Sequence, residues 1–219
     1  MDDATTRREC AAPLEATDAA LVAAFVAGDR NAFERLYRRH EAPLFRTALA
    51  MTRRRPLAEE LLQETFLRAY RHVGRIRLEE GASLRPWLHR ILLHLVYDHT
   101  ARARGATSPL EGVVERLASP LVSPERRAEQ RELAHSVGDA LGALPLKQRA
   151  AVVLFYLHDM DVEEIAATLG VPEGTVKSRL YYGRARLREM LAREALAAGG
   201  ATVPGPAGAP SARRGVVGA

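Results

Sequence analysis

Residues 174–191 near the C-terminus, with the sequence GTVKSRLYYGRARLREML, form a stretch that is rich in cationic side chains. Read as a helix, this stretch gathers its apolar residues, among them Val176, Leu180 and Leu187, on one side. Its lysine and arginine side chains lie on both flanks of that apolar stripe. Guanidinium and ammonium groups bind phosphate oxygens through charge-assisted hydrogen bonds. The stretch is therefore predicted to bind a polyanion such as nucleic acid and not to catalyse a reaction.

A second group of residues could in principle hold a metal ion. His94, Asp98 and His99 stand at i, i+4 and i+5 on a predicted helix. His99 is rotated by about 100° from its neighbour, and no glutamate stands where a general base of a metalloenzyme is expected. A metal-dependent enzyme is the alternative, and bound zinc would indicate it. We expect no metal, no other cofactor and no enzymatic activity.

The residues before the basic stretch predict how it is positioned. Asp161 and Glu164 have the spacing of a capping box, which starts a helix at Val162. Gly170 is suited to end this helix in the left-handed conformation, and Pro172 to open the next one. Two short helices joined by a tight turn form a helix-turn-helix, whose second helix enters the DNA major groove. The alternative is an ordinary amphipathic helix with solvated arginines, but the preceding helix favours DNA binding.

Length and composition limit the fold classes and functions that are compatible with the whole chain. Its 219 residues are 47% hydrophobic but only 5% aromatic, which indicates helical cores built from aliphatic side chains. Lys and Arg outnumber Asp and Glu by 32 to 27, in keeping with a polyanionic partner. The lone Cys10 cannot form an internal disulfide, and no apolar run approaches the length of a membrane span. We expect a cytoplasmic protein without membrane insertion.

Periodicity and proline content predict an all-α protein of two small helical domains joined by a flexible linker. Polar or low-complexity composition marks the tails and the linker, and helical periodicity marks the domains. The predicted segments are an N-terminal tail at 1–17, a helical bundle at 18–104, a linker at 105–127, a helix-turn-helix domain at 128–194 and a Gly/Ala/Pro tail at 195–219. Within the bundle we expect Asp18 and Asp29 to cap helices, Pro43 to bend one slightly and Pro56 to lie in the first turn of another.

Two blocks of the sequence resemble the extracytoplasmic-function (ECF) sigma factors of the sigma-70 family. The stretch LPLKQRAAVVLFYLHDMDVEEIAATLGVPEGTVKSRLYYGRARLREML resembles region 4 of that family. GDRNAFERLYRRHEAPLFRTA, AEELLQETFLRAYR and LRPWLHRILLHLVYDH resemble region 2. The resemblance implies a specificity subunit of bacterial RNA polymerase, which directs promoter recognition and transcription initiation. A conventional regulator that binds duplex DNA without polymerase is the alternative.

The resemblance also implies partners and sites. Region 2 would bind the beta-prime clamp helices of core RNA polymerase and open the minus 10 element, and region 4 would read the minus 35 element against the beta flap. An anti-sigma factor is a further possible partner. The residues implied for the minus 35 element are Arg149, Thr175, Lys177, Ser178, Arg179, Tyr182, Arg184 and Arg186, and those for the minus 10 element are Arg75, Arg77, Arg85, Trp87, Arg90, His94 and Tyr97.

One helical face fits the polymerase contact. Glu60, Gln63, Glu64 and Leu67 recur at i, i+3, i+4 and i+7, opposite an apolar face. Acids at i and i+4 destabilise an isolated helix, and a leucine among them indicates a protein partner. A solvated acidic face is the alternative.

The chain departs from the family pattern at three places. Leu93 and His94 stand where Arg-Asn is frequent, which leaves the minus 10 preference open. Tyr182 stands where an arginine is frequent. Gly183 replaces a frequent alanine, and these changes are expected to loosen the recognition helix by up to about 1 kcal/mol.

Overall fold

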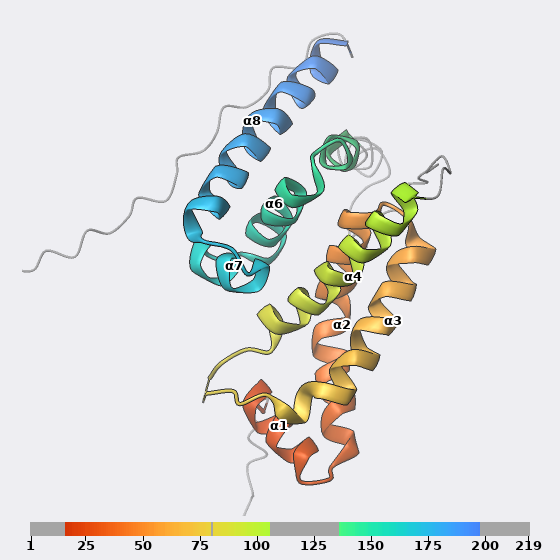
Figure 1. Ribbon diagram of the computed structural model, residues 1–219, viewed down its shortest axis with the longest axis vertical. Coiled ribbons are helices and arrows are strands. Elements are labelled where there is room, and N and C mark those ends of the chain that lie inside the picture. The colour runs from red at the N-terminus through yellow and green to blue at the C-terminus, as the bar shows by residue number, and fades with distance from the viewer. Residues whose placement is uncertain (1–15, 80, 106–135, 198–219) are drawn as a thin grey trace, which may run out of the picture.

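The computed structural model describes residues 16–79, 81–105 and 136–197, and every regular element in these ranges is helical (Figure 1). Except for residue 105, the predicted linker at 105–127 lies outside the described residues. Residues 1–15 of the predicted N-terminal tail and residues 198–219 of the C-terminal tail also lie outside them. The elements are α1 (Asp18–Val26), α2 (Arg30–Thr52), α3 (Arg55–His72), a 3-10 turn (Val73–Arg75), α4 (Arg85–Gly105), a helical stretch at 136–142, α6 (Leu146–His158), α7 (Val162–Leu169) and α8 (Glu173–Ala197).

The N-terminal unit is a bundle of α2, α3 and α4, with α1 packed on α2. Leucines at helical spacing, such as Leu36 and Leu44 of α2, are buried in its core. Asp29 caps α2 as predicted, because its carboxylate accepts a hydrogen bond from Asn31 N at 2.9 Å. Pro43 lies inside α2, which continues through it.

Asp18 has a different position from the one that the sequence predicted. Thr17 caps α1 through its side chain, and Asp18 is the first residue of the helix. The Asp18 carboxylate is buried and accepts hydrogen bonds from His40 Nε2 at 2.9 Å, Arg39 Nη1 at 2.8 Å and Leu84 N at 2.7 Å. Burial raises the pKa of this carboxyl, but the bonds from His40, Leu84 and Arg39 outweigh it and hold the pKa well below its usual value. Asp18 therefore ties α1, α2 and the start of α4 together.

The C-terminal unit consists of α6, α7 and α8 and contains the predicted helix-turn-helix. Both hydrogen bonds of the capping box are present, from Glu164 N to Asp161 Oδ1 at 2.8 Å and from Asp161 N to Glu164 Oε2 at 3.1 Å. Gly170 ends α7 with φ +64°, the left-handed conformation that glycine adopts without strain. Val176 and Leu180 of α8 are buried against this unit, as the apolar stripe predicts.

Gly183 lies on the apolar stripe of α8 that the sequence predicted to pack against the core. It is buried where α8 crosses α6, and a β-carbon at this position would lie 2.8 Å from Val152 Cγ2. We expect Gly183→Ala to lower the free energy of unfolding by about 1 kcal/mol, because the overlap outweighs the gain in helix propensity. Urea unfolding would measure the change. Gly174→Ala is the matched control, since a β-carbon there meets nothing within 4 Å; a Gly183→Ala protein as stable as this control would contradict the prediction.

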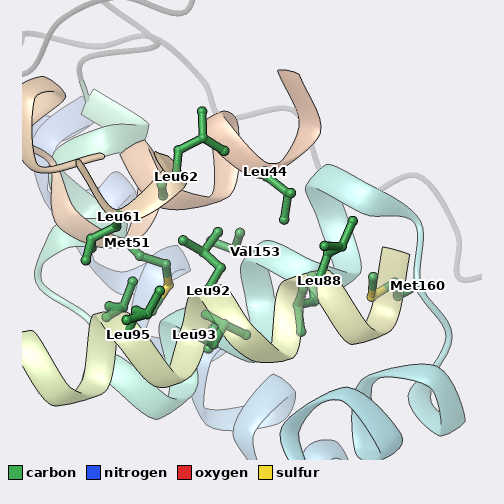
Figure 2. Packing of buried hydrophobic residues seen from close by; sticks show 14 of the residues in the cluster. Leu44, Met51, Leu61, Leu62, Leu88, Leu92, Leu93, Leu95, Val153 and Met160 are labelled. Atoms are coloured by element: carbon green, nitrogen blue, oxygen red, sulfur yellow. The ribbon is translucent and has the colours of Figure 1, made fainter. Parts of the chain in front are cut away.

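The two helical units pack directly on each other. Helix α4 contacts α7, and α2 contacts α6 (Figure 1). Leu44, Leu88 and Leu92 of the first unit belong to one buried cluster with Val153 and Met160 of the second (Figure 2). The prediction of an all-α fold with two helical units is confirmed, but in this structure the units share a continuous core. No helix in the described part of the chain is long and apolar enough to cross a membrane.

Candidate nucleic-acid and polymerase interface

The outward face of α8 carries the residues predicted to read DNA. Ser178 and Tyr182 are exposed, and Ser178 Oγ donates a hydrogen bond to Thr175 O at 2.9 Å. Lys177 Nζ lies 3.0 Å from Glu173 Oε2, an exposed pair of little energetic weight. The face therefore offers hydroxyl and aromatic groups in its centre. Cationic groups, of which Arg184 and Arg186 are exposed, lie around them.

Helix α4 carries most residues predicted for the minus 10 element. Arg90 and His94 are exposed, and Trp87 is half-buried against the core. Arg85 is turned toward the C-terminal unit, where its Nη1 donates to His158 O at 2.8 Å. The Tyr97 hydroxyl is buried and has no hydrogen-bond partner among the residues that the structure describes, and burial raises the pKa of this phenol. The structure thus divides this set into exposed members and partly buried members, of which Arg85 contacts the C-terminal unit.

The loop before α4 contributes Arg75 and Arg77. Both side chains are exposed. Arg75 ends the 3-10 turn after α3, and Arg77 lies on the segment between this turn and α4, so both cations lie outside α4.

Arg149 was predicted to contact the minus 35 element, but its guanidinium is held within the protein. Its Nη1 donates to Met51 O at 2.6 Å, and its Nη2 donates to Gly142 O and to Leu144 O. Burial, together with the nearby Arg53, lowers the pKa of Arg149. In this arrangement the side chain joins the two units and does not face α8's DNA-reading surface.

The predicted polymerase face of α3 is on the surface. Glu60 and Gln63 are exposed, and Glu64 Oε1 pairs with Arg68 Nε at 2.7 Å. Leu67 is 53% exposed, and the sequence reasoning overlooked Tyr70, one turn further on, which is 47% exposed. The signal for Tyr70 was its i+3 spacing from Leu67. Two large apolar side chains beside two acids form a surface suited to a protein partner.

A buried polar network that the sequence did not predict lies between the two units. His89 Nδ1 donates to Arg85 O at 2.8 Å. Thr47 Oγ1 lies 3.1 Å from His89 Nε2 and 2.6 Å from His158 Nε2, and it also donates to Pro43 O at 3.3 Å. The two imidazole rings lie 4.5 Å apart. Sequence periodicity carries no signal for it, because Thr47 and His158 are 111 residues apart.

The pKa values agree with neutral histidines. Burial, and secondarily the neighbouring His158, lowers the pKa of His89 to about 3. Burial, with the charges of Arg46 and Arg85, lowers the pKa of His158 to about 4. Each ring would have to accept a proton in a site that disfavours positive charge. Among the described residues, no group of three metal-binding side chains is found, and His94, Asp98 and His99 do not form one.

A cationic helix-turn-helix, joined to a helical bundle with an exposed acidic and apolar face on α3, is typical of a DNA-binding transcription protein. Residues 36–106 match the family Sigma-70 region 2, and residues 134–187 match Sigma-70, region 4. The chain belongs to the ECF sigma factors of the sigma-70 family. It is a non-enzymatic subunit that directs RNA polymerase in promoter recognition.

Characterised relatives cover most of the chain. It is 42% identical over 178 residues to the ECF RNA polymerase sigma factor SigM of Mycobacterium tuberculosis H37Rv. The alignment spans 81% of this chain and 86% of that relative. It is 28% identical over 161 residues to SigM of Bacillus subtilis strain 168, spanning 73% of this chain and 95% of that one.

Solved structures show the same fold. The structure of CnrH in complex with the cytosolic domain of CnrY aligns with a TM-score of 0.60 and 26% identity over 81% of this chain and 98% of CnrH. RpoE of Bartonella quintana, in complex with the anti-sigma factor NepR, aligns with a TM-score of 0.61 at 24% identity over 73% of this chain and 96% of that one. At that identity the second likeness concerns the fold alone.

Proposed function

We propose that the chain binds core RNA polymerase through the α3 face and reads the minus 35 element through α8. The observation that carries this proposal is the presence of regions 2 and 4 in one chain, together with exposed residues of the predicted sets on α3, α4 and α8. A stand-alone regulator would have no use for the acidic and apolar α3 face. The proposed linker at 105–127 would connect the two regions on the polymerase.

The roles of individual residues follow the positions of their side chains. The exposed members of the α8 set contact bases and phosphates of the minus 35 element, and those of the α4 set and the preceding loop contact the minus 10 element. Glu60, Gln63, Glu64 and Leu67, with Tyr70 added, contact the beta-prime clamp helices, and region 4 lies against the beta flap. The proposed location is the cytoplasm, where the polymerase is. An anti-sigma factor is a proposed regulator, since the similar structures of CnrH and RpoE are complexes with CnrY and with the anti-sigma factor NepR.

Transcription in vitro tests the function directly. Core RNA polymerase of M. tuberculosis would be supplied with a pool of bacterial genomic fragments, with and without this protein, and the start sites mapped. We expect a defined set of start sites that appears only with the protein and shares two upstream elements. Identical transcripts in both reactions, or a protein that binds duplex DNA while never joining the polymerase, would support the stand-alone regulator instead.

Charge reversal tests the α3 face. We expect Glu60→Lys with Glu64→Lys to weaken core polymerase binding by about tenfold or more, or about 1.4 kcal/mol, because the acids face a protein partner. Titration of core polymerase with labelled protein would measure the affinity. Glu34→Lys with Glu41→Lys is the matched control, since it changes the net charge equally on the surface of α2. Equal affinities for the two double variants would remove the α3 face from the interface.

The salt dependence of DNA binding tests Arg179. Once a promoter is mapped, anisotropy titrations of its minus 35 duplex at several salt concentrations would give the slope of log K against log salt. We expect Arg179→Ala to weaken binding and to reduce that slope by about one unit, because one phosphate contact is lost. Lys147→Ala, an exposed lysine on α6 outside the predicted set, should leave the slope unchanged. An unaltered slope for Arg179→Ala would show that this side chain makes no phosphate contact.

A further inference from the structure

We propose that Asp18 is a positioning residue for promoter opening, because it anchors the segment that leads into α4 and separates two groups of the minus 10 set. This inference rests on the proposed function, since it assigns a role to the support beneath the residues that would read the minus 10 element. Asp18 itself does not contact DNA in this proposal. It acts through Ser83 and Leu84, the two residues that precede α4.

The α4 end of the segment is bonded to a single carboxylate oxygen. Ser83 Oγ donates to Asp18 Oδ2 at 3.1 Å, and Leu84 N donates to the same oxygen at 2.7 Å. Ser83 Oγ also accepts from Arg85 N, at the first residue of α4, at 3.2 Å. Asp18 and Ser83 therefore satisfy backbone donors that the start of a helix leaves without an intrahelical partner. The place where α4 begins thus depends on a carboxylate of α1.

The carboxylate is itself held from α2. His40 Nε2 lies 2.9 Å from Asp18 Oδ2, and Arg39 Nη1 donates to Asp18 Oδ1 at 2.8 Å. The side chains of Asp18 and His40 are buried. Burial raises the pKa of this carboxyl, but the hydrogen bonds that it accepts lower the pKa further, so the acceptor stays ionised and its bonds are charge-assisted. A continuous series of contacts therefore joins the bundle core to the segment before α4.

Packing and a backbone hydrogen bond fix the other end of the segment. Ile76 N donates to Val73 O at 3.1 Å, and the side chains of Ile76 and Leu78 are half-buried against the core. Between the two fixed ends, Arg77 is exposed. The segment therefore presents a cation to solvent from a backbone that is held on both sides.

The anchor lies between members of the minus 10 set. Arg75 and Arg77 precede it in the chain, and Arg85, Trp87 and Arg90 follow it on α4. Cationic and aromatic groups bind an unpaired strand together only when their spacing matches that of its phosphates and bases. Loss of the anchor would keep all of these side chains but loosen the position of one group relative to the other. We therefore expect weaker binding of the separated strand.

Substitution of Ser83 tests the proposal without disturbing the core, since this side chain is exposed. Ser83→Ala removes the hydroxyl that joins the segment to Asp18, and Ser83→Thr keeps it. Arg39→Ala is the matched control, because it removes a bond to the other oxygen of the same carboxylate and keeps both bonds to the segment. Asp18→Ala removes both bonds to the segment at once.

Three affinities would be measured for each variant by fluorescence titration. They are the affinity for M. tuberculosis core polymerase, that of the holoenzyme for the minus 35 duplex of a mapped promoter, and that of the holoenzyme for a single strand with the minus 10 sequence of the same promoter. Permanganate reactivity of unpaired thymines would follow promoter opening.

We expect Ser83→Ala to weaken strand binding and to slow promoter opening by about fivefold, the fold-change of one net hydrogen bond, and to leave the other two affinities unchanged. Ser83→Thr and Arg39→Ala should bind the strand as the unaltered protein does. Asp18→Ala should show the larger loss, and the Ser83→Ala variant decides the test even where Asp18→Ala does not fold.

Three results would overturn the positioning role. They are a Ser83→Ala protein with unchanged strand binding, an equal loss in Arg39→Ala, and a loss spread over all three affinities, since the last two indicate a general loss of stability. The proposed function fails separately. If the unaltered protein forms no holoenzyme or its holoenzyme binds no minus 10 strand, the proposed function is wrong and the positioning role falls with it.

Discussion

Asp18→Ala is expected to lower the free energy of unfolding by about 3–5 kcal/mol, the cost typical of removing one partner from a buried ion pair. The loss is large because the carboxylate is the common acceptor for His40, Arg39 and the backbone N–H of Leu84. With alanine at this position, the imidazole and the amide keep their desolvation cost and lose their acceptor. Urea unfolding at pH 7, followed by circular dichroism, measures the difference.

The pH of that experiment matters. Because the folded-state pKa of Asp18 is lowered, its stabilising effect is fully present above the unfolded value of 3.8 and is lost only as pH falls below it. Asp98→Ala, an exposed aspartate on α4, is the matched control and should change stability by no more than about 0.5 kcal/mol. If Asp18→Ala proved as mild as this control, the carboxylate would not be the centre that ties α1 to α2 and α4.

The protein is expected to lose stability steeply as pH falls below about 6.5, because His89 and His158 resist protonation in the folded state. Their pKa values are lowered to about 3 and about 4, so below 6.5 the unfolded chain binds protons that the folded chain does not. Each group then costs about 1.4 kcal/mol per pH unit until its own folded pKa is reached. At pH 5 the combined loss is on the order of 4 kcal/mol. Arg46 and Arg85 oppose the charging of His158, and Asp159 favours it.

Matched variants isolate this effect from other titrating groups. His89→Gln with His158→Gln keeps polar side chains in the network but removes both titrations. Thermal unfolding of the two proteins between pH 7.5 and pH 5 gives the dependence of stability on pH. We expect the double variant to have the shallower dependence. Parallel curves would show that the two histidines do not set the acid sensitivity.

The sequence predicted those features of the protein that depend on interactions between residues close together in the chain. The capping box of Asp161 and Glu164 and the left-handed Gly170 depend on residues within a few positions of one another, so their types and spacing suffice. The same holds for the α3 face, where Leu67 is exposed and Leu62 and Phe66 on the opposite side are buried. Helical periodicity alone separates two such faces. The order of the two blocks then indicated the family that the comparisons confirm.

Contacts between distant residues required the tertiary structure. Asp18 has the residue type and position expected of an N-terminal cap, but the cap is one residue earlier, at Thr17. The Asp18 carboxylate therefore binds partners that are 22 and 66 residues away. Arg149 belongs to a basic surface by sequence, yet the carbonyl of Met51, 98 residues earlier, holds it between the regions. A hydrogen bond between distant residues leaves no periodic trace along the chain.

The amino-acid sequence by itself therefore determined the helices, their apolar and polar faces, the helix-turn-helix and the family, because neighbouring side chains and backbone groups decide each of these. Only the tertiary structure decided which of the polar residues are engaged within the protein. The packing of α7 on α4, the hydroxyl of Thr47 between two histidines and the hydrogen bond from Arg149 to Met51 O depend on how whole helices meet in space. The physical reason is that burial and long-range hydrogen bonding depend on the three-dimensional neighbours of a residue, which its position in the chain does not specify.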